Sequence, residues 1–262
     1  MKLKTLLIIS ILLILPFRVF AFDHNHKAFT DVLQKHVHMV NNGLESKVDY
    51  AALKKDPSSL NSYLQTLTDV KKETFSKWPK EKRLAFLINA YNAFTIDLIV
   101  RNYPVKSIRK IGSFGSSPWK IKFVNLLGKT ISLDDIDHGM VREKGIYDEP
   151  RIHFALVCAS IGCPALQNKA FAHDRLEAML EVGLVTFLSD RSRNRFNQKK
   201  NRFEVSKIFK WYGGDFNQKY KSVTGLLNKY SKTLVADKKE LKKAGKATKI
   251  NYLNYNWDLN KL

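Results

Sequence analysis

Hydrophobic residues recur at helical spacing through much of the first half of the chain. Between residues 28 and 40 the apolar positions predict a helix that ends at Asn41-Asn42-Gly43. A second helix is expected to start near Pro57, and a third opens at Trp78-Pro79. Apolar side chains of the third segment follow the i, i+3, i+4 pattern up to Ile99 and also fill most of its remaining circumference. That distribution predicts a buried central helix.

Beyond the central helix, the pattern changes to short alternating runs. Trp119 to Phe123 alternates with period two before a turn at Gly128-Lys129, which indicates a hairpin. A further helix starts at Leu133, another covers 173–188, and residues 251–257 alternate like an edge strand. These elements predict an α+β fold: a mostly helical single domain around a small antiparallel sheet. The order of elements is similar to papain-like and transglutaminase-like architectures.

The N-terminus has the pattern of a secretory signal peptide. Two lysines precede an apolar run from Leu6 to Phe17, and Val19-Phe20-Ala21 follows, with small or short residues at the two positions that a signal peptidase inspects. The run is short for a membrane span. We therefore expect a signal peptide at residues 1–21 and one domain at residues 22–262, periplasmic or secreted after cleavage near Ala21. An uncleaved anchor is the alternative.

Composition and charge narrow the possible partners. The chain has 262 residues, 44% of them hydrophobic, which excludes disorder for its bulk. Its formal net charge is +21, and the densest basic segment, residues 231–249, is typical of a solvated helix or a polybasic surface strip. An exported chain rarely meets nucleic acid, so anionic envelope components are the expected partner for this charge. We assign no cofactor and expect a monomer that meets a small molecule or peptide.

Both cysteines lie in the segment 148–164, and three interpretations of them remain open. Cys158 and Cys163 close a small loop as a disulfide in the first. In the second, Cys158 is a thiol nucleophile. The third is a metal site that also uses histidines, but these spacings match no common zinc pattern, so we assign no metal.

A nucleophilic cysteine needs a general base. His153 is close in sequence, yet five residues place it on another face of a helix than Cys158. His138 is therefore the better base, with Asp137 as the group that orients it. The candidate catalytic residues are Cys158, His138, Asp137 and His153.

Four further residues are candidates for binding substrate: Asn89, Asn92, Arg151 and Cys163. Asn92 lies at the edge of the apolar stripe of the central helix, so its alternative role is to bond a neighbouring backbone segment. Arg151 either binds a substrate carboxylate or forms an ion pair with Asp148 or Glu149. We expect the central helix, the Asp137-His138 helix and the cysteine segment to converge on one cleft.

The segment around Trp211 and the histidines near the N-terminus are also candidate sites, but their patterns favour structural roles. Lys210-Trp211-Tyr212, with Asp215, favours a packing corner over a stacking platform. His24, His26, His36 and His38 are interpreted as exposed helix or tail residues, with a copper or nickel site near the terminus as the weaker alternative.

Several segments resemble the exported bacterial branch of the family of domains of unknown function number 547, over nearly the whole mature chain. The chain departs from that pattern at Asp137, where Glu is usual, and at Val157, where Asn is usual. Relatives that carry the domain beside DEP or glutaredoxin modules associate it with thiol chemistry. The matching segments are Val48-Asp49-Tyr50, Phe86 to Ala93, Leu133 to His138 with Arg142, Pro150 to Ala155, Cys158 to Pro164, Ile208 to Tyr212 with Asp215-Phe216, and Tyr252 to Asn260.

The resemblance implies a family without an established activity, so two functions follow from the candidate site. One is a thiol-dependent amide hydrolase or acyl transferase. The other is a non-catalytic periplasmic binding module for a small anionic or thiol ligand, with a Cys158–Cys163 disulfide. The first function needs a free cysteine of lowered pKa, and the second does not.

Overall fold

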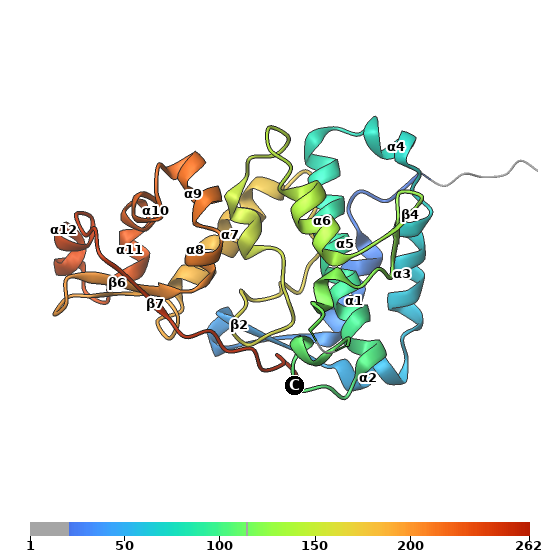
Figure 1. Cartoon of the computed structure of the whole chain (residues 1–262), viewed down its shortest axis with the longest axis horizontal. Coiled ribbons are helices and arrows are strands. Elements are labelled where there is room, and N and C mark those ends of the chain that lie inside the picture. The colour runs from blue at the N-terminus through green and yellow to red at the C-terminus, as the bar shows by residue number, and fades with distance from the viewer. Residues whose placement is uncertain (1–20, 114) are drawn as a thin grey trace, which may run out of the picture.

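The computed structural model of the chain describes residues 21–262 with the exception of residue 114, so the expected signal peptide lies outside the described residues apart from Ala21. The fold is α+β, as expected, with helices α1–α6 in one part and α8–α12 with β6 and β7 in another (Figure 1). The helices are α1 Lys27–His36, α2 Tyr50–Lys55, α3 Ser58–Thr68, α4 Lys72–Ser76, α5 Lys80–Asn102, α6 Leu133–Ile136, α7 Leu176–Ser189, α8 Ile208–Trp211, α9 Gly213–Tyr220, α10 Val223–Lys229, α11 Ser231–Leu234 and α12 Leu241–Ala244. The strands are β1 Val37–Val40, β2 Glu45–Val48, β3 Val124–Leu126, β4 Lys129–Ile131, β5 Arg195–Asn197, β6 Arg202–Ser206 and β7 Ile250–Leu253.

Helix α5 is the centre of the larger core, as its sequence predicts. It begins directly after Trp78-Pro79, and every residue from Leu84 to Val100 is buried. Among the described residues it is the one helix long and apolar enough to cross a membrane, and its most apolar window is 94% buried inside the fold. Helices α2, α3 and α6 pack around it, and α1 packs on α2 and α3. Its all-round hydrophobicity therefore reflects a core position.

The first predicted helix is too long. Helix α1 ends at His36, and Val37 to Val40 form strand β1, which pairs antiparallel with β2 in the register Val37 to Val48. β-branched residues such as Val37 and Val40 pack well on a strand, but the three-residue spacing of these two valines is equally compatible with a helix. The neighbouring histidines also differ from expectation, because His26 and His36 are only 1% and 4% exposed.

In the part of the chain that the structure describes, the small strands form three separate sheets instead of one. The expected hairpin exists, but its strands are β3 and β4, and Trp119 lies in a 3₁₀ turn before them. In the third sheet, β6 pairs antiparallel with β5 and parallel with the edge strand β7. A parallel partner requires a long crossover, which helices α8–α12 provide. These helices, α7 and β6 enclose a second hydrophobic cluster.

The C-terminal segment returns from β7 across the cysteine segment to the first part of the fold, where the C-terminus lies beside α2 (Figure 1). Its backbone bonds the chain at widely separated points: Leu259 N donates to Lys106 O at 2.9 Å, and Leu262 N donates to Val48 O at 3.0 Å. The Tyr50 hydroxyl donates to Asn260 Oδ1 at 2.9 Å. The tail therefore joins the two parts of the molecule.

Two buried amides of α5 hold the segments that follow the hairpin. Asn92 Nδ2 donates to Ala155 O at 2.9 Å, and Asn92 Oδ1 accepts from Val157 N at 2.9 Å. Asn89 makes the same pair of bonds to the backbone of Phe171, at 2.7 and 2.9 Å. The structural interpretation of Asn92 is confirmed, and each amide satisfies one donor and one acceptor that would otherwise be buried without a partner.

Replacing Asn92 with leucine should lower the free energy of unfolding by about 1–3 kcal/mol, because Ala155 O and Val157 N would lose their buried partner. Urea unfolding followed by circular dichroism measures the change. Asn61→Leu is the matched control, since Asn61 is exposed on helix α3. Equal midpoints for Asn92→Leu and the control would contradict the proposed role of the amide.

Candidate functional site

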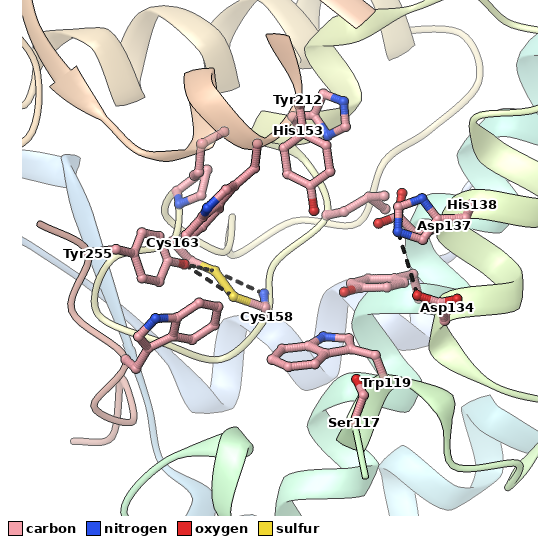
Figure 2. Close-up of a pocket in the computed structure, with 16 residues that line it drawn as sticks. Ser117, Trp119, Asp134, Asp137, His138, His153, Cys158, Cys163, Tyr212 and Tyr255 are labelled. Atoms are coloured by element: carbon pink, nitrogen blue, oxygen red, sulfur yellow. Dashed lines mark hydrogen bonds and ion pairs between the residues drawn. A yellow bond between two sulfur atoms is a disulfide. The ribbon is translucent and has the colours of Figure 1, made fainter. Parts of the chain in front are cut away.

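A pocket of about 290 Å³ opens where the two parts of the fold meet (Figure 2). Helix α5 contributes Tyr91, and the segment after α6 contributes Asp137 and His138. The cysteine segment contributes Cys158 and Cys163. The three segments expected to converge therefore do so. The lining residues are Tyr91, Ser117, Trp119, Asp134, Asp137, His138, His153, Leu156, Cys158, Cys163, Pro164, Ile208, Trp211, Tyr212, Tyr255 and Trp257.

Cys158 and Cys163 form a disulfide in the wall of this pocket, with their Cα atoms 6.4 Å apart. The Tyr255 hydroxyl lies 3.2 Å from Cys158 Sγ and 3.1 Å from Cys163 Sγ. Ser160 Oγ lies 3.2 Å from Cys158 Sγ and 2.8 Å from the Tyr255 hydroxyl. Both sulfurs are thus in contact with hydroxyl groups (Figure 2).

The C-terminal tail brings Tyr255 to the disulfide. Gly162 N donates to Asn256 O and Ile161 N donates to Asp258 O, each at 2.8 Å. A Cβ at Gly162 would lie 2.8 Å from the Tyr255 ring and 2.9 Å from Asn256 O. Only glycine lets the tail approach this closely.

His153 is held by a carboxylate and an aromatic ring. Its Nε2 lies 2.7 Å from Asp215 Oδ2, and its ring stacks on Tyr212 at 3.8 Å between centroids. Burial lowers the pKa of His153, although the bond to Asp215 opposes the shift. Burial alone would raise the pKa of Asp215, but hydrogen bonds from His153 and Arg142 bring it well below its usual value. The pair therefore combines an ionised Asp215 with a neutral imidazole near pH 7.

Two other carboxylates face the pocket from α6 and the turn after it. Asp137 is 8% exposed, and its Oδ1 is buried without a hydrogen-bond partner among the described residues. Burial raises the pKa of this carboxyl, while His153 and His138 oppose the shift. Asp134 Oδ1 lies 3.5 Å from His138 Nε2, and Arg142 contacts His138 Nδ1. His138 therefore contacts Asp134 and Arg142, and among the described residues no hydrogen bond or ion pair joins it to Asp137, the residue expected to orient it.

Aromatic rings make up much of the remaining wall. Tyr255 and Trp257 lie 4.5 Å apart between ring centroids, and Trp211 lies 4.9 Å from Tyr255. Trp119 faces Trp257 at 5.8 Å. Trp211 is 45% exposed, so this large apolar ring is open to solvent. Together with Tyr91 and Tyr212, these rings present several flat apolar faces to the pocket.

Three candidate substrate-binding residues lie outside the lining. Asn89 and Asn92 bond the backbone as described above, and Arg151 is in an ionic cluster instead. The Arg151 side chain is 4% exposed and contacts Glu149 at 2.6 Å, Glu177 at 2.6 Å and Glu181 at 3.1 Å. The ion pair with Glu149, one of the two expected alternatives, is confirmed.

Four residues at the pocket were not expected there from the sequence: Asp215, Trp211, Tyr212 and Tyr255. The expected packing corner at Trp211-Tyr212 is in fact one wall of the pocket, and Asp215 is the partner of His153. The sequence signal that could have identified them is that all four lie in segments that resemble the family. Within residues 21–262, residue 114 aside, no group of three or more His, Cys, Asp or Glu side chains is placed to hold a metal ion.

Residues 75–188 match the family described as "Protein of unknown function, DUF547", which supports the family resemblance noted above. The match contains α5, α6 and the cysteine segment. No curated protein and no solved structure matches the chain.

The ionic cluster at Arg151 predicts a loss of stability at acid pH. Burial alone would raise the pKa of Glu149, but hydrogen bonds from Arg151 and Lys219 lower it to about 2 from an ordinary 4.5. This carboxylate therefore stabilises the fold above about pH 4.5, and its contribution is lost as the pH falls towards 2. In Glu149→Gln, the deficit in unfolding free energy should be largest at neutral pH and shrink across this window.

Urea unfolding at a series of pH values measures that deficit. Glu73→Gln is the control, because Glu73 is exposed on helix α4. A constant deficit for Glu149→Gln from neutral pH to pH 2 would show that the ionised carboxylate is not what stabilises the cluster.

Proposed function

We propose that the chain is an exported, non-catalytic binding module whose pocket takes a small organic ligand beside an intact Cys158–Cys163 disulfide. The observation that carries this proposal is the state of the two sulfurs. They are bonded to each other, and their side-chain partners among the described residues are the hydroxyls of Ser160 and Tyr255. A cysteine nucleophile needs a free thiolate beside a base or a cation, and no such group contacts these sulfurs within the described residues.

The lining favours a ligand with a flat or apolar body and a positive group. Aromatic faces attract cations through the negative charge above and below the ring. Asp134 and Asp137 add carboxylates to the same wall, and the lowered pKa of His153 keeps that imidazole neutral. A cation near Asp137 would also stabilise its ionised form. The acidic and aromatic lining thus supports a cationic ligand better than the anionic one considered from the sequence.

Benzyltrimethylammonium should therefore bind the pocket, and phenylacetate, which carries the opposite charge on a similar ring, should bind more weakly. Calorimetric titration of the folded protein measures both. Asp134→Asn and Trp119→Leu should each weaken binding of the cation several-fold, since one cation–π contact contributes about 0.5–2 kcal/mol. Asp174→Asn is the matched control, because Asp174 is an exposed carboxylate outside the pocket lining. Tighter binding of phenylacetate would contradict a cation site.

One observation supports a second candidate function, that of a thiol-dependent amide hydrolase or acyl transferase. Cys158 lines the same pocket as His153, whose imidazole is oriented by Asp215. Orientation of a histidine by a carboxylate is the arrangement that supports a general base. This function requires that the disulfide be reduced first, which gives two thiols, and that the pocket then bring His153 or His138 to Cys158.

Iodoacetamide labelling distinguishes the two functions. The binding module should not be labelled without reductant, because neither sulfur is a thiol, and both cysteines should be labelled after reduction. After reduction, the enzyme should show rapid labelling of Cys158 at neutral pH, slowed about tenfold or more by His138→Ala or His153→Ala. Mass spectrometry of the digested protein assigns the label to each cysteine. Rapid labelling of Cys158 without reductant would reject the binding module as proposed.

A further inference from the structure

The first three residues after Ala21 are Phe22, Asp23 and His24. We propose that removal of the leader after Ala21 creates a copper(II) site from the free amine of Phe22, the backbone nitrogens of Asp23 and His24, and the imidazole of His24. This inference rests on the cleavage included in the proposed function, and it is independent of what the pocket binds.

The chemistry depends on histidine being the third residue. An amine, two backbone nitrogens and one imidazole nitrogen then close three fused chelate rings around a single ion, in one plane. Cu²⁺ prefers such a tetragonal set of nitrogen ligands, and it binds more strongly than Ni²⁺ or Zn²⁺ to most such sites. Binding releases the protons of the two amides, and that of the amine where it is charged, to the solvent. Asp23 suits the second position because, unlike proline, it has a backbone N–H to lose.

Within the described residues, the oxygens of residues 22–24 accept hydrogen bonds and their backbone nitrogens donate none. Asp23 O accepts from His26 N at 3.1 Å. The Asp23 carboxylate accepts from Asn25 N at 2.9 Å and from Lys27 N at 2.8 Å, at the start of α1. The backbone nitrogens of residues 22–24 donate no hydrogen bond to the part of the chain that the structure describes. Metal binding at these nitrogens would therefore break none of the bonds that begin α1.

The His24 side chain also has an unused ligand atom. Its Nδ1, the ring nitrogen closest to its own backbone, is buried and has no hydrogen-bond partner among the described residues. The ring packs against Trp78 at 4.4 Å and Phe22 at 5.4 Å between centroids. These contacts keep the imidazole beside the residue that would carry the free amine. The chelate needs only this one side chain, so the absence of a cluster of metal-binding side chains in the described residues does not bear on it.

Two full-length mature chains test the site without changing any folded residue. Removable fusion partners would give one chain that begins at Phe22 and one that begins at Ala21, which moves His24 to the fourth position. The chain from Phe22 should bind one Cu²⁺ in competition with glycine and show an electron paramagnetic resonance spectrum with four nitrogen ligands. The chain from Ala21 should bind Cu²⁺ more weakly, by on the order of 100-fold, and lose that spectrum. His24→Ala in the Phe22 chain should have the same effect.

Equal affinity and equal spectra for the two chains would overturn the site, and so would a Phe22 chain without the four-nitrogen spectrum. The intact mass of the exported protein tests the cleavage separately. A mass that begins at Phe22 supports the site in the mature protein. Any other N-terminus rejects the proposed cleavage, and with it the site in the exported protein, whatever the two defined chains bind.

Discussion

The side-chain amide of Asn92 determines where the cysteine segment lies. Its two hydrogen bonds, to Ala155 O and Val157 N, join that segment to helix α5, which is buried on all sides. Few other contacts are available to an irregular backbone in such a place, because an apolar helix offers it no donor or acceptor. In this low-dielectric setting the bonds are strong and an unpaired group is costly. Cys158 follows directly, so the position of the disulfide in the pocket depends on a residue that does not line the pocket.

The same division of roles holds across the site. The residues that line the pocket include aromatic rings, carboxylates and the disulfide. The polar groups that hold these residues in place lie outside the lining. Arg142 is an example: it pairs with Asp215 at 2.7 Å and thereby helps to fix the carboxylate that holds His153. Arg151, in its cluster of glutamates, ties the first turn of the cysteine segment to helix α7. These ionic groups therefore pair with one another, and Asp134 and Asp137 are the carboxyl side chains that line the pocket.

The sequence predicted those parts of the structure that depend on neighbours within a few turns. The buried helix α5, the start of α3 and the hairpin turn follow from local periodicity, and the role of Asn92 follows from one polar residue beside an apolar stripe. The meeting of three segments was also predicted. Local pattern could not reveal the partner of His153, which lies 62 residues away, or the hydroxyl of Tyr255, 95 residues from Ser160. The parallel pairing of β7 with β6 could not be predicted for the same reason, because the periodicity of a strand does not identify its partner.

The path of the C-terminal tail has a consequence for how the molecule is assembled. Tyr255 and Trp257 complete the pocket, and Asn260 bonds Tyr50 across 210 residues of sequence. Synthesis proceeds from the N-terminus, so Cys158 and Cys163 are made before these residues. The cysteines can thus meet while the pocket still lacks one wall, and the tail then covers a loop that has already closed. The pocket lining is in this way complete only in chains that extend through Tyr255 and Trp257.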